Sequence, residues 1–438
     1  MKIFRVLVLV IIALLISTPP ALAFCGFYVG KADASLYNKA SQVIIARDGK
    51  RTVLTMANDY QGEIKDFALV VPVPVVLKKE QVNIGEGKIM ERLDAFSAPR
   101  LVEYFDPDPC AVYGRSRDEV MSPVPSASVR QKNEAREGSL GVTVEAKFTV
   151  GEYDILILSA KESNGLETWL RQNGYKIPKG ASQLLQPYIR QNLKFFVAKV
   201  NLQEYAKTGF SSLRPLMMAY ESPRFMLPIR LGMINSKGEQ DLIVYLLSPK
   251  GQTELTNYRT VKIPSDTDIP EFVQKEFSSF YKSMFQKSYE REGKKVAFLE
   301  YAWDMSSCDP CSSEPLSPEE LKKAGVFWTT TEGNPYGTVF ISRLHIRYSR
   351  NTFPEDLQFQ ETGNRQLFQG RYVLRHPFKG EVKCAAGENY QRQTKQRQEQ
   401  EAQNLARLTG WDINQIRGKI NFIEVESVPW WQRLWRSF

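Results

Sequence analysis

Short runs rich in apolar and β-branched residues in the early part of the chain predict β structure. Two such runs lie on either side of an Asp-Gly pair at 48–49. Because glycine supplies the positive φ that tight hairpin turns require, the sequence predicts a β-hairpin here. The next apolar run, 67–77, carries Pro72 and Pro74. Prolines two residues apart remove amide donors from the same side of a strand, so we expect an edge strand.

Apolar residues spaced three and four apart predict helices further along the chain. The first helix spans 88–105 and is interrupted at Pro99. Another begins at Ser317, where a proline follows and Glu320 completes a capping box. A stretch rich in Gln, Arg and Glu at 388–408 predicts a solvated helix. Further helices are expected at 166–172, 181–191 and 269–291.

Strands account for most of the remaining pattern. Residues 142–150 and 153–158 flank a turn at Gly151 and predict a second hairpin. Strands and helices do not alternate regularly, which argues against a parallel α/β fold. The sequence therefore predicts an α+β fold with mixed, largely antiparallel sheets and several helices. Further strands are expected near 194–200, 225–234, 242–247, 295–303, 338–347 and 370–374.

The N-terminus has the three parts of a cleavable secretory signal peptide. Lys2 and Arg5 precede an unbroken apolar run, and Ala21-Leu22-Ala23 forms an A-x-A cleavage site. The apolar run of about 11 residues is too short for a helix that spans a bilayer, which needs about 20. We expect residues 1–23 to be removed and the protein to be exported to the periplasm or outside the cell. A retained N-terminal anchor is the alternative.

A loss of periodicity divides the rest of the chain. Residues 114–141 are rich in Ser, Pro, Arg, Glu and Gln, a composition typical of a linker or a mobile loop. This segment separates an N-terminal β-rich part, 24–113, from a main α+β domain, 142–386. A polar helical region, 387–427, and a Trp/Arg-rich tail, 428–438, complete the predicted organisation.

Composition and charge narrow the classes of function. The chain has 438 residues, of which 42% are hydrophobic and 11% aromatic, enough for two or three folded domains. The net charge is +9, and removal of the two cations of the leader leaves +7. Because this excess is spread thinly, without a long basic block, we expect no nucleic-acid partner.

The five cysteines are candidates for disulfide bonds. Outside the cytoplasm thiols tend to pair, and an odd number leaves one thiol free or joined to another chain. The sequence leaves the connectivity open. The candidates are Cys25, Cys110, Cys308, Cys311 and Cys384.

Cys308 and Cys311 form a C-x-x-C pair, the spacing of dithiol redox centres. Such centres commonly lower the pKa of one thiol with a helix N-terminus. Here the next predicted helix begins only at Ser317, and the effect of its dipole fades over that separation. We therefore favour a structural crosslink and keep thiol–disulfide exchange as the alternative.

Other catalytic and ligand-binding motifs are weak or missing. The two histidines, His345 and His376, have no second histidine at metal-ligand spacing. His345 alternates with Arg343 and Arg347, which predicts a solvent-facing basic stripe on a strand. Residues 85–88 imitate part of a phosphate loop without its remaining glycine and hydroxyl residue, and neither G-x-S-x-G nor HExxH occurs. We expect no metal, no cofactor and no catalytic triad.

One pair of carboxylates keeps a hydrolase open as an alternative. Glycoside hydrolases use two acidic residues that have no fixed spacing in sequence. Glu300 and Asp304 form such a pair on one predicted strand. We favour a structural role for both.

The C-terminal tail combines tryptophan with arginine. Trp430, Trp431 and Trp435 lie close to Arg433 and Arg436. Tryptophan rings settle at the depth of lipid headgroups and arginines meet phosphates there, so this composition favours peripheral contact with a membrane. The tail is too short to span a bilayer. The alternative is a tail that docks in a groove or stays loose.

Six segments between Cys25 and Cys384 carry a further signal: 25–27, 58–62, 67–74, 303–311, 353–357 and 368–376. Together they resemble an uncharacterised family of exported bacterial proteins, the domain of unknown function 2330. The resemblance implies export and a shared fold. It implies no activity and no catalytic residue, because none is assigned to the family.

These features favour an exported cell-envelope protein that serves as a non-enzymatic binding or structural module. Its expected partner is an envelope protein or a cell-wall component. The rival class is enzymatic, through dithiol exchange at Cys308 and Cys311 or through carboxylate-based hydrolysis.

Overall fold

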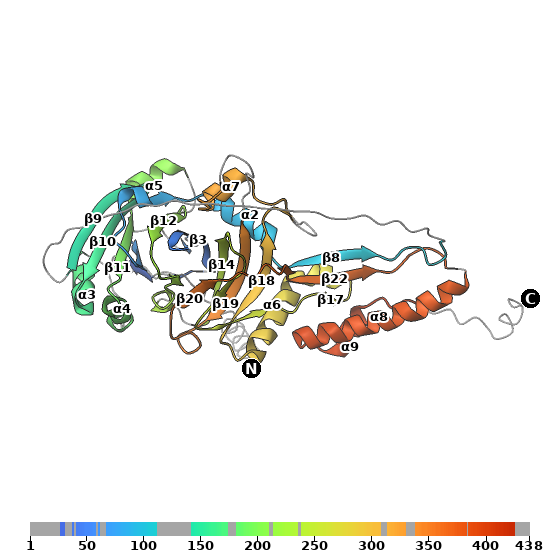
Figure 1. Cartoon of the computed structure of the whole chain (residues 1–438). Helices are drawn as coiled ribbons and strands as arrows, with labels where there is room; N and C mark the ends of the chain where they lie inside the picture. Colours follow the sequence, from blue (N-terminus) through green and yellow to red (C-terminus); the bar gives the residue numbers. More distant parts are fainter. Residues whose placement is uncertain are drawn as a thin grey trace, which may run out of the picture.

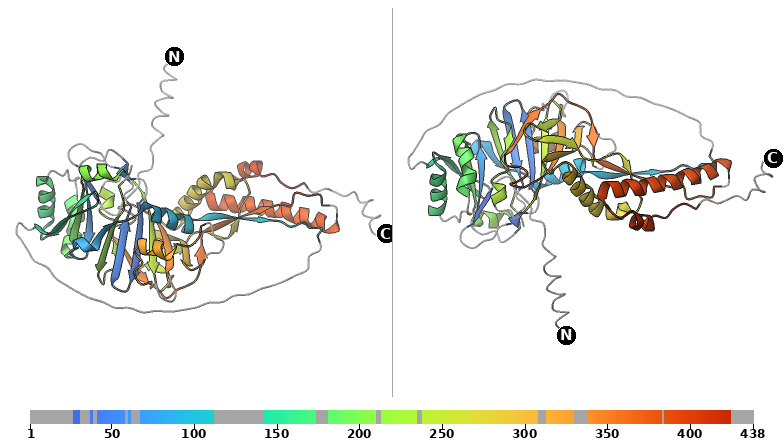
Figure 2. Two further views of the ribbon diagram at one scale, coloured as in Figure 1. Left: turned by 90° about the horizontal axis from the view of Figure 1, so that it is seen from above. Right: turned by 90° about the horizontal axis from the view of Figure 1, so that it is seen from below.

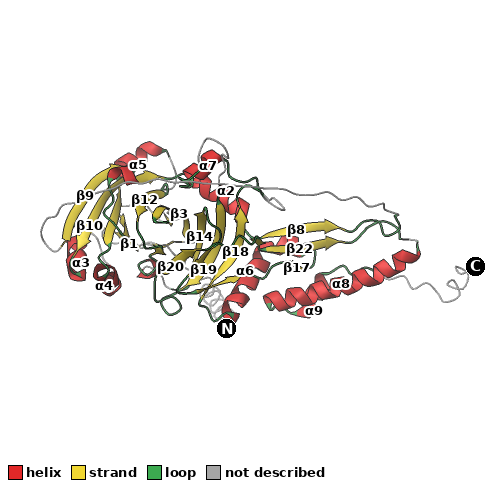
Figure 3. Ribbon diagram, viewed as in Figure 1, coloured by secondary structure: helices red, strands yellow, loops and turns green. Residues whose placement is uncertain are grey.

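The computed structural model describes a four-layer body and an arm that projects from one end of it (Figures 1 and 2). Two sheets face each other in the body, and helices cover their outer faces (Figure 3). The described residues are 27–30, 37–38, 41–57, 60–61, 67–111, 142–173, 181–209, 213–234, 238–307, 313–329, 338–382 and 384–424.

The larger sheet has nine strands. Neighbouring strands are antiparallel, except that β14 pairs with β3 and β16 pairs with β18 in parallel. β3 and β4 form the hairpin predicted at 48–49, where Gly49 has a φ of 59°. In spatial order the strands are β16 (Arg259–Lys262), β18 (Val296–Asp304), β19 (Phe340–Tyr348), β14 (Gln240–Ser248), β3 (Ser41–Asp48), β4 (Arg51–Met56), β12 (Leu216–Glu221) and β7 (Val82–Ile84), with β21 (Phe368–Gln369) paired to β18.

The smaller sheet of the body has five strands, all antiparallel to their neighbours. β9 and β10 form the second predicted hairpin, and Gly151 in its turn has a φ of 53°. In spatial order the strands are β1 (Phe27–Gly30), β6 (Phe67–Val73), β11 (Lys194–Val200), β10 (Tyr153–Ala160) and β9 (Val142–Val150).

The main core lies between these two sheets. In β3, Val43 and Ile45 face the five-stranded sheet, whereas Ile44 and Ala46 face helices on the other side. All four side chains are buried, because a strand covered on both faces is apolar along its whole length. The helices α3 (Ser163–Gln172) and α4 (Ala181–Arg190) cover the five-stranded sheet, and α2 (Gly87–Ser97), α6 (Val273–Arg291) and α7 (Pro318–Lys323) cover the nine-stranded sheet.

Short elements complete the body. One small sheet joins β13, β20 and β15, and another joins β2 and β5. Their bounds, with those of the remaining short helices, are β13 (Met226–Leu227), β20 (Leu357–Glu361), β15 (Thr253–Leu255), β2 (Tyr37–Asn38), β5 (Tyr60–Gln61), α5 (Leu202–Thr208), η1 (Lys79–Gln81) and η2 (Gly232–Ile234).

The arm consists of a parallel sheet and a long helix beside it (Figure 3). The sheet has the order β17, β22, β8, and β8 and β22 run outward together. The helix α8 starts near the outer end of the arm and returns toward the body, where it packs against α6 and β17. These elements are β17 (Thr267–Asp268), β22 (Arg371–His376), β8 (Arg100–Phe105), α8 (Ala385–Thr409) and α9 (Ile413–Lys419).

The α+β fold with largely antiparallel sheets is confirmed, as are the helices predicted at 166–172, 181–191 and 269–291. The helix predicted over 88–105 is wrong in its second half, because α2 ends at Ser97 and residues 100–105 form β8. Ala98 is extended, with a ψ of 148°, as expected of a residue before proline. β22 then offers β8 a parallel partner.

Two strand predictions also need correction. β6 is not an edge strand, because β1 pairs with its first half at 67–70 while β11 pairs along 68–73. Pro72 lies beyond the last residue of β6 that pairs with β1. On the β1 side of β6, its missing N–H therefore removes no ladder hydrogen bond to a described strand. The strand expected at 225–234 shrinks to β13, followed by the short helix η2.

Three predicted segments, 1–23, 114–141 and 428–438, lie outside the described residues. Strands from both sides of 114–141 pair with one another, since β6 joins β11 and β8 joins β22. The boundary drawn through that segment stays a prediction. The polar region 387–427 contains most of α8 and all of α9.

Candidate functional site

A strip of charged and hydroxyl side chains crosses the outer face of the nine-stranded sheet between α2 and α6. It lies between two apolar clusters, one beneath α2 and α7 and one beneath α6 and α8. We call it the charged strip. Its members are Asp94 on α2, Asp241 and Tyr245 on β14, Tyr281 on α6, Glu300 on β18, and Arg343, His345 and Arg347 on β19.

Strand geometry brings these side chains to one face. Residues two apart in a strand share a face, so β19 presents Arg343, His345 and Arg347 together. In β18 the register shifts between Leu299 and Tyr301, which leaves Glu300 as the extra residue of a β-bulge. Consequently Glu300 and Tyr301, although consecutive, both face outward, toward α6 and α2 respectively.

Glu300 lies at the centre of the charged strip. One of its oxygens accepts from Arg343 Nε at 2.6 Å, and the other lies 2.8 Å from His345 Nδ1. The hydroxyl of Tyr281 also donates to Glu300. The other ring nitrogen of His345 lies 3.2 Å from Asp241.

Two further ion pairs extend the strip at its ends. Arg343 Nη1 donates to Asp94 at 2.6 Å. Asp241 accepts two hydrogen bonds of 2.8 Å from the guanidinium of Arg347. The strip therefore pairs three carboxylates with three cations when His345 is protonated.

The electrostatics support that protonation state. Burial disfavours the charged form of Glu300, but His345 and Arg343 outweigh it and lower its pKa to about 2. Burial likewise opposes the charge on His345, while Glu300 and Asp241 raise the pKa of the imidazole above its ordinary value. His345 and Arg347 lower the pKa of Asp241 despite its desolvation. Opposite charges thus hold one another ionised.

This arrangement leaves the strip little catalytic capacity. A protonated imidazole that donates from both nitrogens has no lone pair for a proton or a metal ion. Glu300 is ionised and carries no proton to give to a leaving group. The geometry gives the charged strip a structural role, in which it joins α2 and α6 to the sheet.

The predicted solvent-facing basic stripe is therefore wrong for two of its three members. Arg343 is 6% exposed and His345 is 9% exposed. Helices α2 and α6 cover this face, and carboxylates from β14 and β18 neutralise the cations. The available signal was Glu300 itself, a lone charge in the otherwise apolar run 296–303, which demands a buried partner.

The side chains of Glu300 and Asp304 have different surroundings. Glu300 is 1% exposed and turns toward β19, whereas Asp304 pairs with Arg365 near the surface.

A second buried carboxylate, that of Asp356, also has hydrogen-bond donors on both of its oxygens. It accepts from the hydroxyl of Tyr188 at 2.7 Å and from two nitrogens of the Arg230 guanidinium.

The arm contains a buried carboxyl group with different surroundings. Glu401 on α8 is almost fully buried, and its Oε1 has no hydrogen-bond donor within the described part of the chain. The nearest cation, Arg397, lies 3.4 Å away and donates instead to Asp106. Burial raises the pKa of Glu401 to about 7, with the nearby Asp268 adding to the shift.

A disulfide bond closes the outer end of the arm. Cys110, beyond β8, pairs with Cys384 at the start of α8, and their Cα atoms are 5.9 Å apart. The two cysteines are 274 residues apart in sequence, so spacing alone gave no sign of this pairing. The other disulfide candidates, Cys25, Cys308 and Cys311, lie outside the described residues, and so do the tail residues Trp430, Trp431 and Trp435.

Two aromatic side chains are exposed on the outer part of β8. Phe105 is 74% exposed and stacks on the ring of His376 with centroids 4.5 Å apart. Tyr104 is 44% exposed, and the guanidinium of Arg375 lies 5.3 Å from its centroid. Both rings are therefore held in place on a strand although much of their surface faces solvent.

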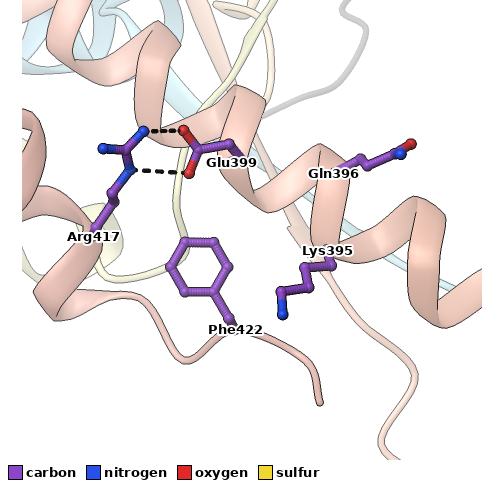
Figure 4. A pocket seen from close by; sticks show the side chains of 5 residues that line it. All are labelled: Lys395, Gln396, Glu399, Arg417 and Phe422. Carbon is purple, nitrogen blue, oxygen red and sulfur yellow. Dashed lines mark hydrogen bonds and ion pairs between the residues drawn. The ribbon is translucent and has the colours of Figure 1, made fainter. Parts of the chain in front are cut away.

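A shallow pocket of about 420 Å³ lies between α8, α9 and the chain that follows α9 (Figure 4). Glu399 and Arg417 form an ion pair at one wall, with Nε and Oε2 3.0 Å apart. The ring of Phe422 forms another wall, and Lys395 and Gln396 complete the rim. The pocket offers an apolar surface beside an ion pair in which both charges already have a partner.

The described residues contain no group of His, Cys, Asp and Glu side chains arranged to hold a metal ion. In the same part of the chain, no helix combines the length and the apolar character needed to cross a bilayer. Neither finding bears on the segments that are not described.

Comparison with known proteins gave one match. A search of curated proteins and a search of solved structures each found none. Residues 19–360 match the model of a family described as "Uncharacterized protein conserved in bacteria (DUF2330)". The arm elements β22 and α8 and the residues 368–376, part of the resemblance noted above, lie beyond the matched range. The chain belongs to this family of uncharacterised bacterial proteins.

Proposed function

We propose that the protein is exported and acts in the cell envelope as a non-enzymatic binding or structural module. Its leader has the three parts of a secretory signal peptide. The disulfide between Cys110 and Cys384 suits an oxidising compartment, because thiols in the cytoplasm are kept reduced.

The observation that carries the proposal is the occupancy of the buried charges in the body. A general acid or base needs a free proton or lone pair within reach of a substrate. In the charged strip, the carboxylate of Glu300 and the ring nitrogens of His345 are already hydrogen-bonded to each other and to neighbouring side chains. Asp356 is bound by Tyr188 and Arg230 in the same way. These side chains stabilise the body of the protein. We therefore assign its function to residues on the surface.

The arm supports the same proposal. Binding proteins often present rigid, exposed aromatic residues to their partners. Phe105 and Tyr104 meet that description, and the disulfide fixes the outer end of the arm on which they lie. The proposed partner is an envelope protein or a cell-wall component, with peripheral membrane contact through Trp430, Trp431 and Trp435.

Binding and turnover can be measured side by side on the mature chain, residues 24–438. The probes are purified cell-wall sacculi, an envelope extract, and insulin as a disulfide substrate. We expect the wild type and the Cys308→Ser/Cys311→Ser variant to retain the same component. We also expect neither to reduce insulin nor to release soluble fragments from sacculi.

Two results would overturn the proposal. Reduction of insulin that disappears in the Cys308→Ser/Cys311→Ser variant would assign thiol–disulfide exchange to the C-x-x-C pair. Release of sugar fragments that disappears in Asp304→Asn, a substitution at a surface ion pair, would assign hydrolysis.

A further inference from the structure

We infer that the contact between α8 and the arm sheet, formed by β8, β17 and β22, is a pH-sensitive switch. The outer part of α8, residues 385–401, packs closely while Glu401 carries a proton, and it detaches more often once Glu401 is ionised. The inference goes beyond the proposed function, because it concerns the conformation of the arm and not what the arm binds.

Glu401 belongs to the buried face of α8. Four polar residues recur there at steps of three and four, so they share one side of the helix. Asn404, the last of them, donates to the backbone of Asp268 on β17 at 3.0 Å, which places this side against the arm sheet. Full hydration of the Glu401 carboxylate, which is 3% exposed, therefore requires α8 to move. The four residues are Thr394, Gln398, Glu401 and Asn404.

The described surroundings of Glu401 offer less pairing than a buried carboxylate needs. Its Oε1 accepts no hydrogen bond within the described part of the chain. Arg397, one turn earlier on α8, approaches it to 3.4 Å, but two nitrogens of that guanidinium donate to Asp106 at 2.7 and 3.2 Å. An ionised Glu401 is thus incompletely paired in a buried place, which is costly.

Neighbouring carboxylates add to this cost. Burial raises the pKa of Glu401 to about 7, and the charges of Asp268 and of Glu271, beyond β17, contribute to the shift. Arg397 and Arg375 on β22 oppose it. Arg375 already pairs with Asp268, with Nε and Oδ1 3.0 Å apart. The proton on Glu401 therefore favours the packed position of α8.

The cations on the other helices that pack against α8 have partners elsewhere. Lys287 on α6 donates to the backbone of Ala406. Arg417 on α9 pairs with Glu399. Both contacts stay intact whether or not Glu401 carries a proton.

His376 is the rival group, because imidazoles titrate near neutral pH. It lies 2.8 Å from Glu103 on β8 and 3.5 Å from Glu271, and its ring stacks on Phe105. These contacts lie within the arm sheet and the segment after β17. We therefore expect protonation of His376 to leave the packing of α8 unchanged.

The two ends of α8 are held differently, which decides where the helix detaches. Toward the body, α8 contributes to the apolar cluster that includes α6. Farther out, the hydrogen bonds of Arg397 with Asp106 and the disulfide at Cys384 hold it. Segments with few buried apolar contacts open most readily. Ionisation of Glu401 thus acts on the outer part, while the disulfide keeps its first turn attached to β8.

Hydrogen exchange measured by mass spectrometry at pH 5 and pH 8 tests the inference on the mature chain with its disulfide intact. After correction for intrinsic exchange rates, the protection of amides in residues 385–401 reports how often this part of α8 detaches. Glu401→Gln keeps the size of the side chain and removes its charge at every pH. Glu399→Gln, at an exposed ion pair of the same helix, is the matched control. His376→Gln tests the imidazole.

We expect detachment in the wild type to become roughly 10–100-fold more frequent between pH 5 and pH 8, because the docked carboxyl binds its proton more tightly than the detached one. Glu399→Gln and His376→Gln should show the same rise, and Glu401→Gln should show none.

Equal protection at both pH values in the folded wild type overturns the inference. So does a rise that persists in Glu401→Gln or disappears in His376→Gln. These outcomes are independent of export, partner binding and turnover, which the preceding experiments test.

Discussion

Glu300, the extra residue of a β-bulge in β18, lets this strand contact both helices that cover its outer face. The bulge turns Glu300 and Tyr301 to the same face, so one meets α6 and the other packs on Phe96 of α2. A buried carboxylate is costly unless it is paired and hydrogen-bonded. Arg343 and His345 supply that pairing from the neighbouring strand.

Replacing Glu300 with glutamine should destabilise the protein by about 3–5 kcal/mol, because Arg343 and His345 lose the buried carboxylate that they share and each keep only one acidic partner. Urea denaturation followed by tryptophan fluorescence measures this loss. Asp304→Asn is the matched control on the same strand, and its surface pair with Arg365 predicts a change below about 1 kcal/mol. Similar losses in the two variants would contradict a special role for the charged strip.

Glu401 leads to a prediction about how the stability of the protein depends on pH. Its pKa is raised to about 7 in the folded protein, so the folded state binds a proton more tightly than the unfolded chain. The stability from this proton is fully present below about pH 4.5 and is lost as the pH rises to about 7. Glu401→Gln should therefore be more stable than the wild type at pH 8, by up to about 3 kcal/mol.

The control for this prediction lies two residues away. Glu399 on α8 forms an exposed pair with Arg417, so Glu399→Gln should change stability by less than about 1 kcal/mol at either pH. Thermal melts at pH 5 and pH 8 compare the two variants. A difference between Glu401→Gln and wild type that does not grow with pH would show that burial does not perturb this carboxyl group.

At the scale of elements, the two hairpins depend on glycines in the left-handed region of φ. Gly49 has open space around it, whereas a side chain at Gly151 would lie 2.7 Å from Cγ1 of Ile84. A residue other than glycine would be strained by the positive φ at either position. Only at position 151 would its side chain also clash with a neighbour.

Alanine substitution separates these two costs. Gly49→Ala should lose about 1 kcal/mol from its backbone alone. Gly151→Ala should lose more, about 2–3 kcal/mol, because Ile84 on β7 must also shift. Equal losses measured by chemical denaturation would mean that the contact between this hairpin and β7 does not constrain the turn.

Local chemistry explains which elements the sequence predicts well. The turns at Gly49 and Gly151 and the capping box of Ser317 with Glu320 need only neighbouring residues, and all three are present in the structure. β8 was missed because its partner, β22, lies 271 residues away in register. The solvated helix predicted at 388–408 buries one face, including Ala402 and Leu405, which its polar composition conceals.

The candidate site was harder to predict than the fold for the same reason. Arg343 and His345 looked like surface cations, since no local pattern shows that α2 and α6 cover their face. Asp241, which completes the surroundings of His345, comes from a strand about a hundred residues earlier. Charge pairing across three strands and two helices depends on topology.

At the scale of the whole molecule, a layered body carries an arm whose outer end is closed by a disulfide bond. The disulfide joins residues 274 apart, and the bridge ties the start of α8 to the end of β8. A crosslink that closes so long a loop stabilises mainly by restricting the chain when it opens.

Cys110→Ser should therefore loosen the arm and leave the body intact. Opening of the arm should become easier by about 2–4 kcal/mol, seen as faster hydrogen exchange in β8 and in the first turns of α8. Exchange in β3 and β14, at the centre of the body, should not change. Reductant should bring the wild type to the rates of the variant, and slow exchange in the arm of Cys110→Ser would contradict the proposed bracing.

The claim on which the account depends most is that this protein works outside the cytoplasm. Mass spectrometry of the native protein, isolated from fractionated cells with its thiols blocked at lysis, tests it directly. We predict an envelope-fraction chain that begins near Phe24 and yields a peptide pair linked through Cys110 and Cys384. A cytosolic chain that retains Met1 and has both of these cysteines reduced would contradict the account.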